Sequence, residues 1–576
     1  MPATGRDVER GIIVVSHKLR GRACATGAIA LTGAAAFVAV GAARPPSGPQ
    51  ISSVPTANQK AVGYAPASRL SPELQQVVVA QGATKLENPH GIVTFYGYEN
   101  DVTAADDPAL PQMLPTPQSA TEAIKTEPDK NTYLVFKRGL GGADPAYDYG
   151  TRFLYQGHEN AAKDAAGRSL GLLSRINLDA DAAHRVTLMA TEDTSGAPIA
   201  TIDGSTWDAF SQRLILTTEN PAKPTYAATP DYPSTVEDVS GALGRGGYEG
   251  VQDDSAGNLW IVEDVGGANK PTTTAKVPNS FVYRYVPRHP GDLSHGRLEA
   301  LQVLNGAGAP ITAASQSALM APDQVALHDY GAALDTRWVP VHDTATDGDA
   351  PFSANAAAKT ARATPFKRPE NGVFAPGSRF TEFFFTETGD TNATSAENGD
   401  PATGAGGAGG WTSIQKLEQS SPSARTGKLT LFYRGNQAHA GFDNLTFLSR
   451  DRLAAVEDAG DTLHAQRDAL DSGFVLDVDA DYADAADEPV RWIAEGRDAS
   501  ATIDAANGGF GKNDGDNELT GAIVSDGDPG PRGILGARTP NLFDGGWRWF
   551  YTQQHGDNTT YEVVASSDDD RRRGGF

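Results

Sequence analysis

Glutamates recur at the ends of short apolar segments along this chain. The segment GNLWIVED, residues 257–264, has a turn, then a half-buried strand, and then two adjacent carboxylates. Acidic side chains are depleted in strands, so their repeated placement at strand ends needs an explanation. Six segments with this pattern end at Glu159, Glu219, Glu263, Glu387, Glu457 and the Gln554–His555 pair. If the fold brings these ends together, the carboxylates repel one another unless cations are bound, and calcium prefers such oxygen ligands.

A second acid precedes several of these segments at a similar distance. Glu249 lies 14 residues before Glu263, and Asp443 lies 14 residues before Glu457. Glu370 lies 17 residues before Glu387. Two acids on adjacent strands of one repeat can converge on a common axis. This spacing therefore predicts two acids per repeat, which together form one ring of acids around one site.

Arg368 lies two residues before Glu370 in the segment KRPENG. Side chains two residues apart on a strand share a face, so the guanidinium is expected beside the acids. It could hold a tetrahedral oxyanion through two parallel hydrogen bonds, or it could form a salt bridge with Glu370. Both interpretations stay open at this point.

The clearest repeat runs from residue 249 to residue 304 and contains the segments EGVQDD, NLWIVED, FVYRYVP and RLEALQVL. Four consecutive antiparallel strands in about 55 residues are typical of one propeller blade. Full or partial copies recur in five other places, so we predict an all-β fold, an irregular six-bladed β-propeller with long loop insertions at 305–365 and 389–410. The segment GIVTFYGY, residues 91–98, is expected to supply a strand that closes the ring with the last blade.

The N-terminal region has the layout of an export signal. Lys18, Arg20 and Arg22 precede an apolar run at residues 23–43 that ends in small residues. A run of this length could also anchor the chain in a membrane, but its many Ala and Gly residues favour cleavage. We therefore predict an export signal at 1–43, a linker at 44–80, the propeller at 81–565 and a disordered tail at 566–576. The mature protein is expected in the periplasm, on the cell surface or outside the cell.

Composition excludes several classes of function. The net charge of −24 argues against nucleic acid as a partner, because phosphate backbones bind basic surfaces. The only cysteine, Cys24, lies in the predicted signal, so disulfide scaffolds, cysteine–zinc sites and a cysteine nucleophile are excluded for the mature chain. No GxSxG motif is found at a strand–helix turn, which argues against a serine hydrolase of that type.

Seven short motifs between about residues 150 and 560 together resemble the PhoX family of exported alkaline phosphatases. They are QGHEN, LTTEN, GYEGVQDDSAGNLWIVED, FKRPENGVFAP, DNLTFLSRDRLAAVEDAGD, NELTG and QQHG. The resemblance implies an irregular six-bladed propeller and a phosphomonoesterase with calcium and iron in its channel. Transferred by motif, Glu249 and Glu370 correspond to metal ligands and Arg368 to the phosphate-binding arginine, and Glu219 lies in a motif that also supplies metal ligands.

The candidate site combines both lines of reasoning. Arg368 is the candidate catalytic residue, and the candidate metal ligands are Glu219, Glu249, Glu263, Glu370, Glu457, Asp443 and Glu518. The chain departs from the family pattern at Thr218, where the family has an iron-binding cysteine, and at Tyr248, where the family often has a histidine. A hydroxyl is a poorer ligand for ferric iron than a thiolate. Calcium is therefore the expected cofactor, and retention of iron is left open.

The leading hypothesis is metal-assisted hydrolysis of small phosphate monoesters by an exported monomer that does not bind membranes once the signal is removed. In this hypothesis Arg368 neutralises charge that develops on the equatorial phosphate oxygens. One alternative is another calcium-dependent propeller hydrolase, lactonase-like or phytase-like, which would use the acids without the arginine. The other alternative is a propeller that binds a protein or polymer without catalysis.

Overall fold

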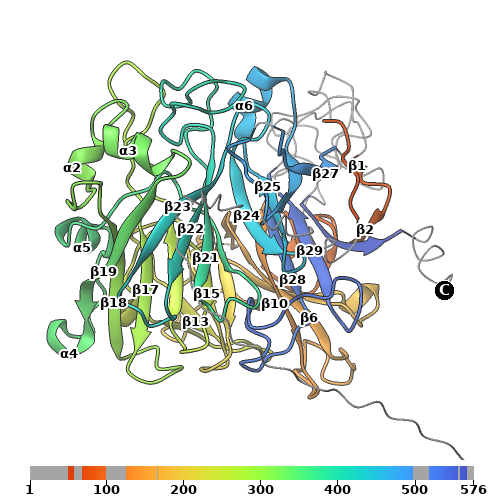
Figure 1. The fold of residues 1–576 in the computed structure, drawn as a ribbon. Coiled ribbons are helices and arrows are strands. Elements are labelled where there is room, and N and C mark those ends of the chain that lie inside the picture. Colours follow the sequence, from red (N-terminus) through yellow and green to blue (C-terminus); the bar gives the residue numbers. More distant parts are fainter. Residues whose placement is uncertain are drawn as a thin grey trace, which may run out of the picture. The chain divides into compact units, whose positions relative to one another are not determined.

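The computed structural model describes residues 50–56, 68–91, 93–98, 125–164, 166–484, 486–496, 518–554 and 558–566. Short antiparallel strands are the main regular structure among them (Figure 1). The predicted export signal and residues 567–576 of the predicted tail lie outside the described residues. None of the described helices is long and apolar enough to cross a membrane.

The first three blades each contain four antiparallel strands, and the first strand of each blade is the innermost. Blade 1 consists of β5 (Pro128–Val135), β6 (Arg152–His158), β9 (Leu173–Asn177) and β10 (Val186–Ala190). Blade 2 consists of β11 (Ser205–Asp208), β12 (Arg213–Leu216), β13 (Tyr226–Ala228) and β14 (Val236–Asp238). Blade 3 consists of β15 (Tyr248–Asp253), β16 (Leu259–Glu263), β17 (Val282–Pro287) and β18 (Gly296–Val303).

The last three blades follow the same order, and two of them gain a strand from the N-terminal region. Blade 4 consists of β20 (Gly372–Phe374), β21 (Glu382–Glu387), β22 (Ser413–Gln419) and β23 (Thr426–Arg434). Blade 5 consists of β24 (Phe442–Phe447), β25 (Arg452–Glu457), β26 (Ser472–Asp477), β27 (Val490–Ala494) and β1 (Arg69–Leu70). Blade 6 consists of β28 (Leu519–Ser525), β29 (Arg548–Gln553), β30 (Thr559–Ala565) and β2 (Leu74–Ala80).

The six inner strands form a closed ring. Each of β5, β11, β15, β20, β24 and β28 contacts the inner strand of the next blade, and β28 contacts β5. The prediction of an irregular six-bladed propeller is therefore confirmed.

The ring is closed by a different segment from the one predicted. Residues 93–95 form β4, which pairs with β3 (Lys85–His90) in a two-stranded sheet outside the blades. The closing strand is β2, which pairs with β30 along its whole length. Residues 69–80, which the sequence analysis assigns to the linker, thus form the outer strands of blades 5 and 6. Their pairing partners lie more than 400 residues away, so composition alone could not reveal the assignment.

The predicted insertion at 305–365 is not simply a loop. It contains β19 (Ala333–Asp343), which pairs with both β18 and β23 and joins blades 3 and 4 into one nine-stranded sheet. Four short helices flank this strand: α2 (Ala313–Gln316), α3 (Pro322–Leu327), α4 (Thr344–Asp347) and α5 (Ala354–Thr360). In Figure 1, α2 and α3 lie towards the same end of the blades as α6 (Gly460–Arg467), and α4 lies at the other end. The remaining small elements are α1 (Ser240–Leu243), the 3₁₀ turn Ala182–His184, β7 (Ala162–Lys163) and β8 (Ser169–Leu170).

Aromatic side chains fill the space between blades. Trp260 on β16 packs against Trp338 on β19 and Phe374 on β20, with ring centroids 5.1 Å apart in each case. Trp492 of blade 5 packs against Trp549 of blade 6 at 4.4 Å. All five side chains are buried, and edge-to-face aromatic pairs add stability beyond the burial of their area. This packing holds the inner strands, and the residues at their ends, in fixed relative positions.

The role of β1 and β2 can be tested by truncation. Removal of residues 1–81 leaves the outer edges of β27 and β30 unpaired, and such exposed edges promote association between chains. We expect a lower melting temperature and concentration-dependent self-association by light scattering. Removal of residues 1–49 alone, the matched control, is expected to change neither. Equal behaviour of the two truncated chains would contradict the closing role of β2.

Candidate metal centre

The inner strands place an acid at the same point in five of the six blades. These acids are Asp129, Asp203, Glu249, Glu370 and Asp443, and blade 6 has Thr520 instead. In blades 1, 3 and 5 the acid follows a residue that pairs with the end of the second strand, and the register then shifts by a bulge. A bulge re-aims the unpaired side chain. Here it turns the acids towards the mouth of the channel.

The residue after the second strand forms a second ring. Its backbone N–H donates to a carbonyl just before the inner strand, at 2.7–2.9 Å, in the pairs Glu159 with Glu127, Asp264 with Gly247, Thr388 with Arg368, Asp458 with Gly441 and Gln554 with Glu518. Glu219 lies at the corresponding place in blade 2, three residues beyond β12. Because the same hydrogen bond recurs, acids from several blades and Arg368 are gathered at one rim.

The two rings surround one cavity of about 240 Å³. Carboxylate oxygens approach within 4.8 Å of one another in four overlapping groups: Asp129, Glu159 and Glu518; Glu159, Asp203 and Glu219; Glu219, Glu249 and Asp264; and Glu249, Glu370 and Asp443. Neighbouring groups share a residue, so nine acids form one continuous cluster, which we call the channel acids. Such closeness between like charges is costly unless protons or cations offset it.

Burial and mutual repulsion keep protons on several channel acids. Burial, followed by the charge of Asp129, raises the pKa of Asp443 to about 7. The pKa values of Asp203, Glu219, Glu249, Glu370 and Glu518 are also raised, first by burial and then by neighbouring carboxylates, although Arg368 opposes the shift of Glu370. Without bound cations, some of the channel acids are therefore protonated and uncharged.

Two basic side chains lie beside the channel acids. Arg368 donates from Nε to Asp264 Oδ2 at 2.8 Å, and its Nη2 lies 2.6 Å from Glu370 Oε1. Burial by itself lowers the pKa of Arg368, but Asp264, Glu370 and Asp458 raise it well above the usual value, so the guanidinium stays charged. Its backbone adopts a φ of 54°, which is unusual for a residue with a side chain and marks a position held by its surroundings.

The second basic residue, Lys130, was not predicted. Its buried Nζ donates to Asn444 Oδ1 at 2.5 Å. Burial lowers the pKa of Lys130, and the nearby Asp443 and Asp129 oppose that shift. Lys130 lies next to the inner ring of acids and lines the small cavity at the other end of the inner strands, not the acidic cavity.

Two of the predicted metal ligands lie outside the cluster. Glu263 accepts hydrogen bonds from Phe281 N, Tyr283 Oη and Asn355 Nδ2 inside blade 3, and burial raises its pKa to about 8. Glu457 forms a bidentate ion pair with Arg467 at 2.9 and 2.8 Å in blade 5. Glu387, the strand-end glutamate of blade 4, also lies outside the cluster.

Glu387 at the end of β21 is bound inside blade 4. It accepts from Lys367 N and Ser413 Oγ and pairs with His328 at 2.8 Å. Burial alone would raise the pKa of Glu387, but the ion pair with His328 lowers it to about 2. In all three blades the last residue of the second strand points into its own blade, and in blades 3 and 5 the next residue, Asp264 or Asp458, faces the channel.

The structure brings the other predicted residues together. Glu219, Glu249, Glu370, Asp443 and Glu518 all belong to the channel acids, and Arg368 lies beside them. Sequence reasoning missed Asp129, Asp203 and Asp264 and did not select Glu159. The second acid of the segment GNLWIVED, Asp264, is thus the channel residue, and the first, Glu263, is not. The repeated pattern of an acid followed by Gly or Asn in IDG, YEG and FDN could have identified the inner ring.

The donor set fits a hard cation. Three carboxylate oxygens of the channel acids, Asp264 Oδ1, Glu370 Oε2 and Asp443 Oδ2, are buried and have no hydrogen-bond partner. Among the described residues, all the groups that could hold a metal consist of carboxylates, without imidazole or thiolate. Thr218 does not line the cavity, and its Oγ1 accepts a hydrogen bond from Asn220 N at 3.0 Å. Carboxylate oxygens of this kind suit calcium, magnesium or manganese better than softer metals.

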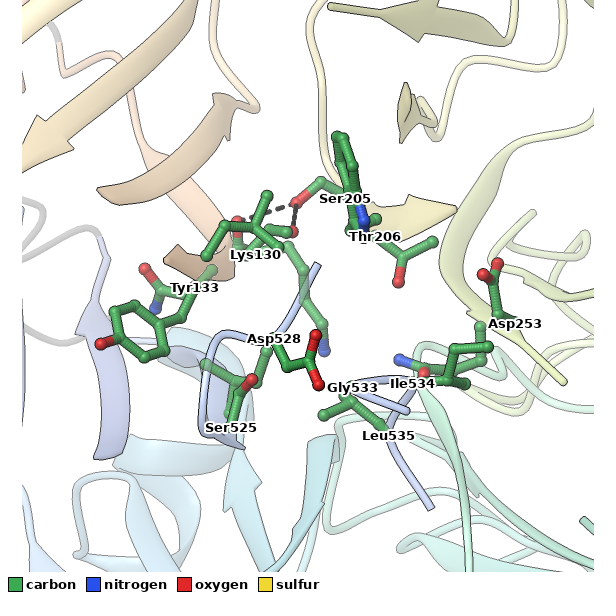
Figure 2. A pocket seen from close by; sticks show the side chains of 16 residues that line it. Lys130, Tyr133, Ser205, Thr206, Asp253, Ser525, Asp528, Gly533, Ile534 and Leu535 are labelled. Carbon is green, nitrogen blue, oxygen red and sulfur yellow. Dashed lines mark hydrogen bonds between the residues drawn. The ribbon is translucent and has the colours of Figure 1, made fainter. Parts of the chain in front are cut away.

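The other end of the inner strands is nearly filled. Residues 533–535, in the connection between β28 and β29, approach β5, β11 and β15 and leave a cavity of only about 40 Å³ (Figure 2). Figure 2 also shows Ser205 hydrogen-bonded between strands: its Oγ lies 2.8 Å from Thr132 Oγ1 and donates to the carbonyl of Lys130. The channel acids are therefore approached from the opposite mouth.

Comparison with protein families supports the motif-based interpretation. The family described as alkaline phosphatase PhoX matches residues 272–528, a narrower stretch than the motifs suggested but one that contains Arg368, Glu370, Asp443 and Glu518. The resemblance to the PhoX family is thereby confirmed. No curated protein matches the chain.

Comparison with solved structures supports the fold. The structure of Pseudomonas fluorescens PhoX in complex with vanadate, a transition-state analogue, matches with a TM-score of 0.51 at 12% identity, covering 89% of this chain and 98% of that chain. A GH43_1 enzyme from Xanthomonas citri complexed with xylotriose matches with a TM-score of 0.27 at 10% identity, over 58% of this chain and 83% of that chain. At these identities the first match establishes a common fold, and the second is too distant to inform the site.

The protonation of the channel acids predicts how stability depends on pH. The folded-state pKa of Asp443 is about 7, above its ordinary value of 3.8, so the folded protein binds more protons than the unfolded chain between these values. In the presence of a chelator, the melting temperature should therefore fall as the pH rises from 5 to 8. The variant Asp443→Asn should show a weaker dependence. A melting temperature that rises over this range without metal would contradict the electrostatic interpretation.

Proposed function

We propose that the protein is a metal-dependent phosphatase that hydrolyses small phosphate monoesters at the acidic mouth of its channel. The observation that carries the proposal is a charged guanidinium, Arg368, held at the wall of a cavity that is otherwise lined largely by carboxylates. The match of residues 272–528 to the PhoX family supports the same activity. Calcium is the proposed metal, because the channel acids offer only oxygen ligands.

The channel acids are the residues that would hold the metals. Their unpartnered buried oxygens, on Asp264, Glu370 and Asp443, are the strongest candidates for direct ligands. When bound, the metals would neutralise phosphate oxygens and lower the pKa of the attacking water. Thr218 contributes no thiolate, so iron is not part of the proposal.

Arg368 would bind and orient the phosphate. Asp264 and Glu370 fix its Nε and Nη2, so the guanidinium is already positioned before substrate enters. An arginine held in this way can donate to phosphate oxygens and stabilise the charge that develops on them. In the net reaction, the ester P–O bond breaks, the oxygen of water bonds to phosphorus, and a proton from that water is transferred to the departing alkoxide.

The location of the protein is also part of the proposal. The basic and apolar pattern at residues 1–43 supports export, and the matched family is one of exported enzymes. A monomer that acts on soluble esters is the simplest arrangement for a single closed ring of blades.

Replacement of Arg368 separates the phosphatase from a lactonase-like hydrolase. Arg368→Ala should lower kcat/KM for p-nitrophenyl phosphate by about a hundredfold, because a donor to the transition state is lost. Arg368→Lys keeps the charge but not the two-pronged donor geometry, so an intermediate loss is expected. Retention of full phosphatase activity by Arg368→Ala would contradict its role, and lactone hydrolysis that survives the change would favour the alternative enzyme.

Two adjacent residues provide a matched test of the metal site. Chelation should abolish phosphatase activity, and added calcium should restore it. Asp264→Asn should raise the calcium concentration needed for half-maximal recovery by about tenfold, because one charged ligand is lost. Glu263→Gln, the control one residue away, should leave that concentration unchanged, since Glu263 lies inside the blade with its pKa near 8. Activity that is insensitive to chelators, or equal shifts in both variants, would count against the proposed centre.

A further inference from the structure

A second pocket adjoins the acidic cavity at its rim. It has a volume of about 290 Å³ and shares Thr391 and Gly460 with that cavity. At about 30 Å³ for each water, it has room for roughly ten water molecules, enough for a small polyhydroxylated molecule. We call this space the side pocket. It lies where a substrate would extend beyond a phosphate bound at Arg368.

The side pocket has a polar lining. Asn269, Thr274, Asn392 and Thr462 supply uncharged hydrogen-bonding groups, and no apolar or aromatic side chain lines it. Such a lining binds hydroxyl and carboxylate groups better than aryl or alkyl groups, which gain little from entering a polar site.

The charge balance of the side pocket differs from that of the channel. Its one acid, Asp390, is neutralised by the buried Lys367, whose Nζ lies 2.7 and 2.9 Å from the two carboxylate oxygens. The remaining charged residue is Lys276, which forms no ion pair with any residue that the structure describes. The side pocket therefore carries a net positive charge next to a cavity of acids.

Lys276 is held in place by its backbone. Its N–H donates to Asp390 Oδ1 at 3.0 Å, and the residue forms a β-bridge with Asn269 in the connection between β16 and β17. Burial, and then the charge of Arg368, lower the pKa of Lys276, and Asp264, Asp390 and Glu370 oppose that shift, so Lys276 lies near both Arg368 and the rim of the channel acids. Two cations facing adjacent pockets are suited to a ligand with two anionic groups.

Building on the proposed function, we propose that the side pocket binds the leaving group of the substrate. It selects phosphate monoesters whose leaving group carries a second anionic group. Lys276 determines this selectivity. The phosphate to be hydrolysed would lie at Arg368, and the second anion would pair with the ammonium group of Lys276. The reaction is the hydrolysis given above, and the released hydroxylated anion leaves through the side pocket.

The test compares esters of similar size in the calcium-loaded, full-length protein. For wild type, kcat/KM should be about tenfold higher for 3-phosphoglycerate, whose leaving group carries a carboxylate, than for glycerol 3-phosphate. Fructose 1,6-bisphosphate compared with fructose 6-phosphate tests a second phosphate in the same way. Lys276→Gln should reduce these ratios to about one, and Lys276→Arg should largely retain them, because charge-assisted hydrogen bonds are worth about tenfold or more.

A control variant and an inhibition assay complete the test. Lys223→Gln removes one positive charge from an exposed lysine outside the side pocket and should leave the ratios as in wild type. Glycerate should inhibit wild type at about tenfold lower concentration than glycerol, a readout that needs no variant. Hydrolysis with equal ratios in wild type and Lys276→Gln, or equal inhibition by glycerate and glycerol, overturns the side-pocket assignment and leaves the phosphatase intact. Failure to hydrolyse any of these esters overturns both.

Discussion

Repulsion among buried carboxylates is the constraint on which the channel depends. Nine acids from six blades approach one another within a few ångströms, and among the described residues the charged guanidinium of Arg368 is the cation held beside them by ion pairs. A propeller can tolerate this because aromatic packing between the blades, as at Trp260, holds the inner strands independently of what the channel contains. The free energy stored in that repulsion favours the binding of divalent cations.

A buried network of alternating charges organises the rim around the channel. Lys367 pairs with Asp390 and with Glu397, and Lys270 pairs with Glu397, all with almost no exposure to solvent. Buried pairs of this kind fix geometry more reliably than they add stability. Because Lys367 precedes Arg368 in the chain and Asp390 also accepts from the backbone of Lys276, one network positions both cations that face the two pockets.

The repeated architecture explains why acids from distant parts of the chain meet. Blades 1, 3 and 5 begin with the same backbone arrangement, a bulged inner strand hydrogen-bonded to the residue after the second strand, and blades 4 and 6 share that hydrogen bond. Variation between blades then decides the chemistry. At the inner-ring position five blades have an acid, and blade 6 has Thr520. Two residues before that position, blades 3 and 5 have glycines, and blade 4 has Arg368. The site is therefore asymmetric although its scaffold is repetitive.

The sequence by itself determined the fold class and most of the outer strands, because alternating apolar residues and turn residues are local signals. It also identified five of the nine channel acids, together with Arg368. It selected Glu263 where the structure places Asp264 in the cluster. A shift of one residue turns a side chain to the other face, and the bulges that set this shift depend on the partner strand. The inner strands β5, β11 and β28 were not among the strand-like segments recognised in the sequence. Three features were decided only by the tertiary structure: the pairing of β2 with β30, the ion pair that turns Glu457 into its own blade, and the position of Lys276 in a pocket that adjoins the cavity with Arg368. Each joins segments that are separate in the sequence or re-aims a side chain through its neighbours.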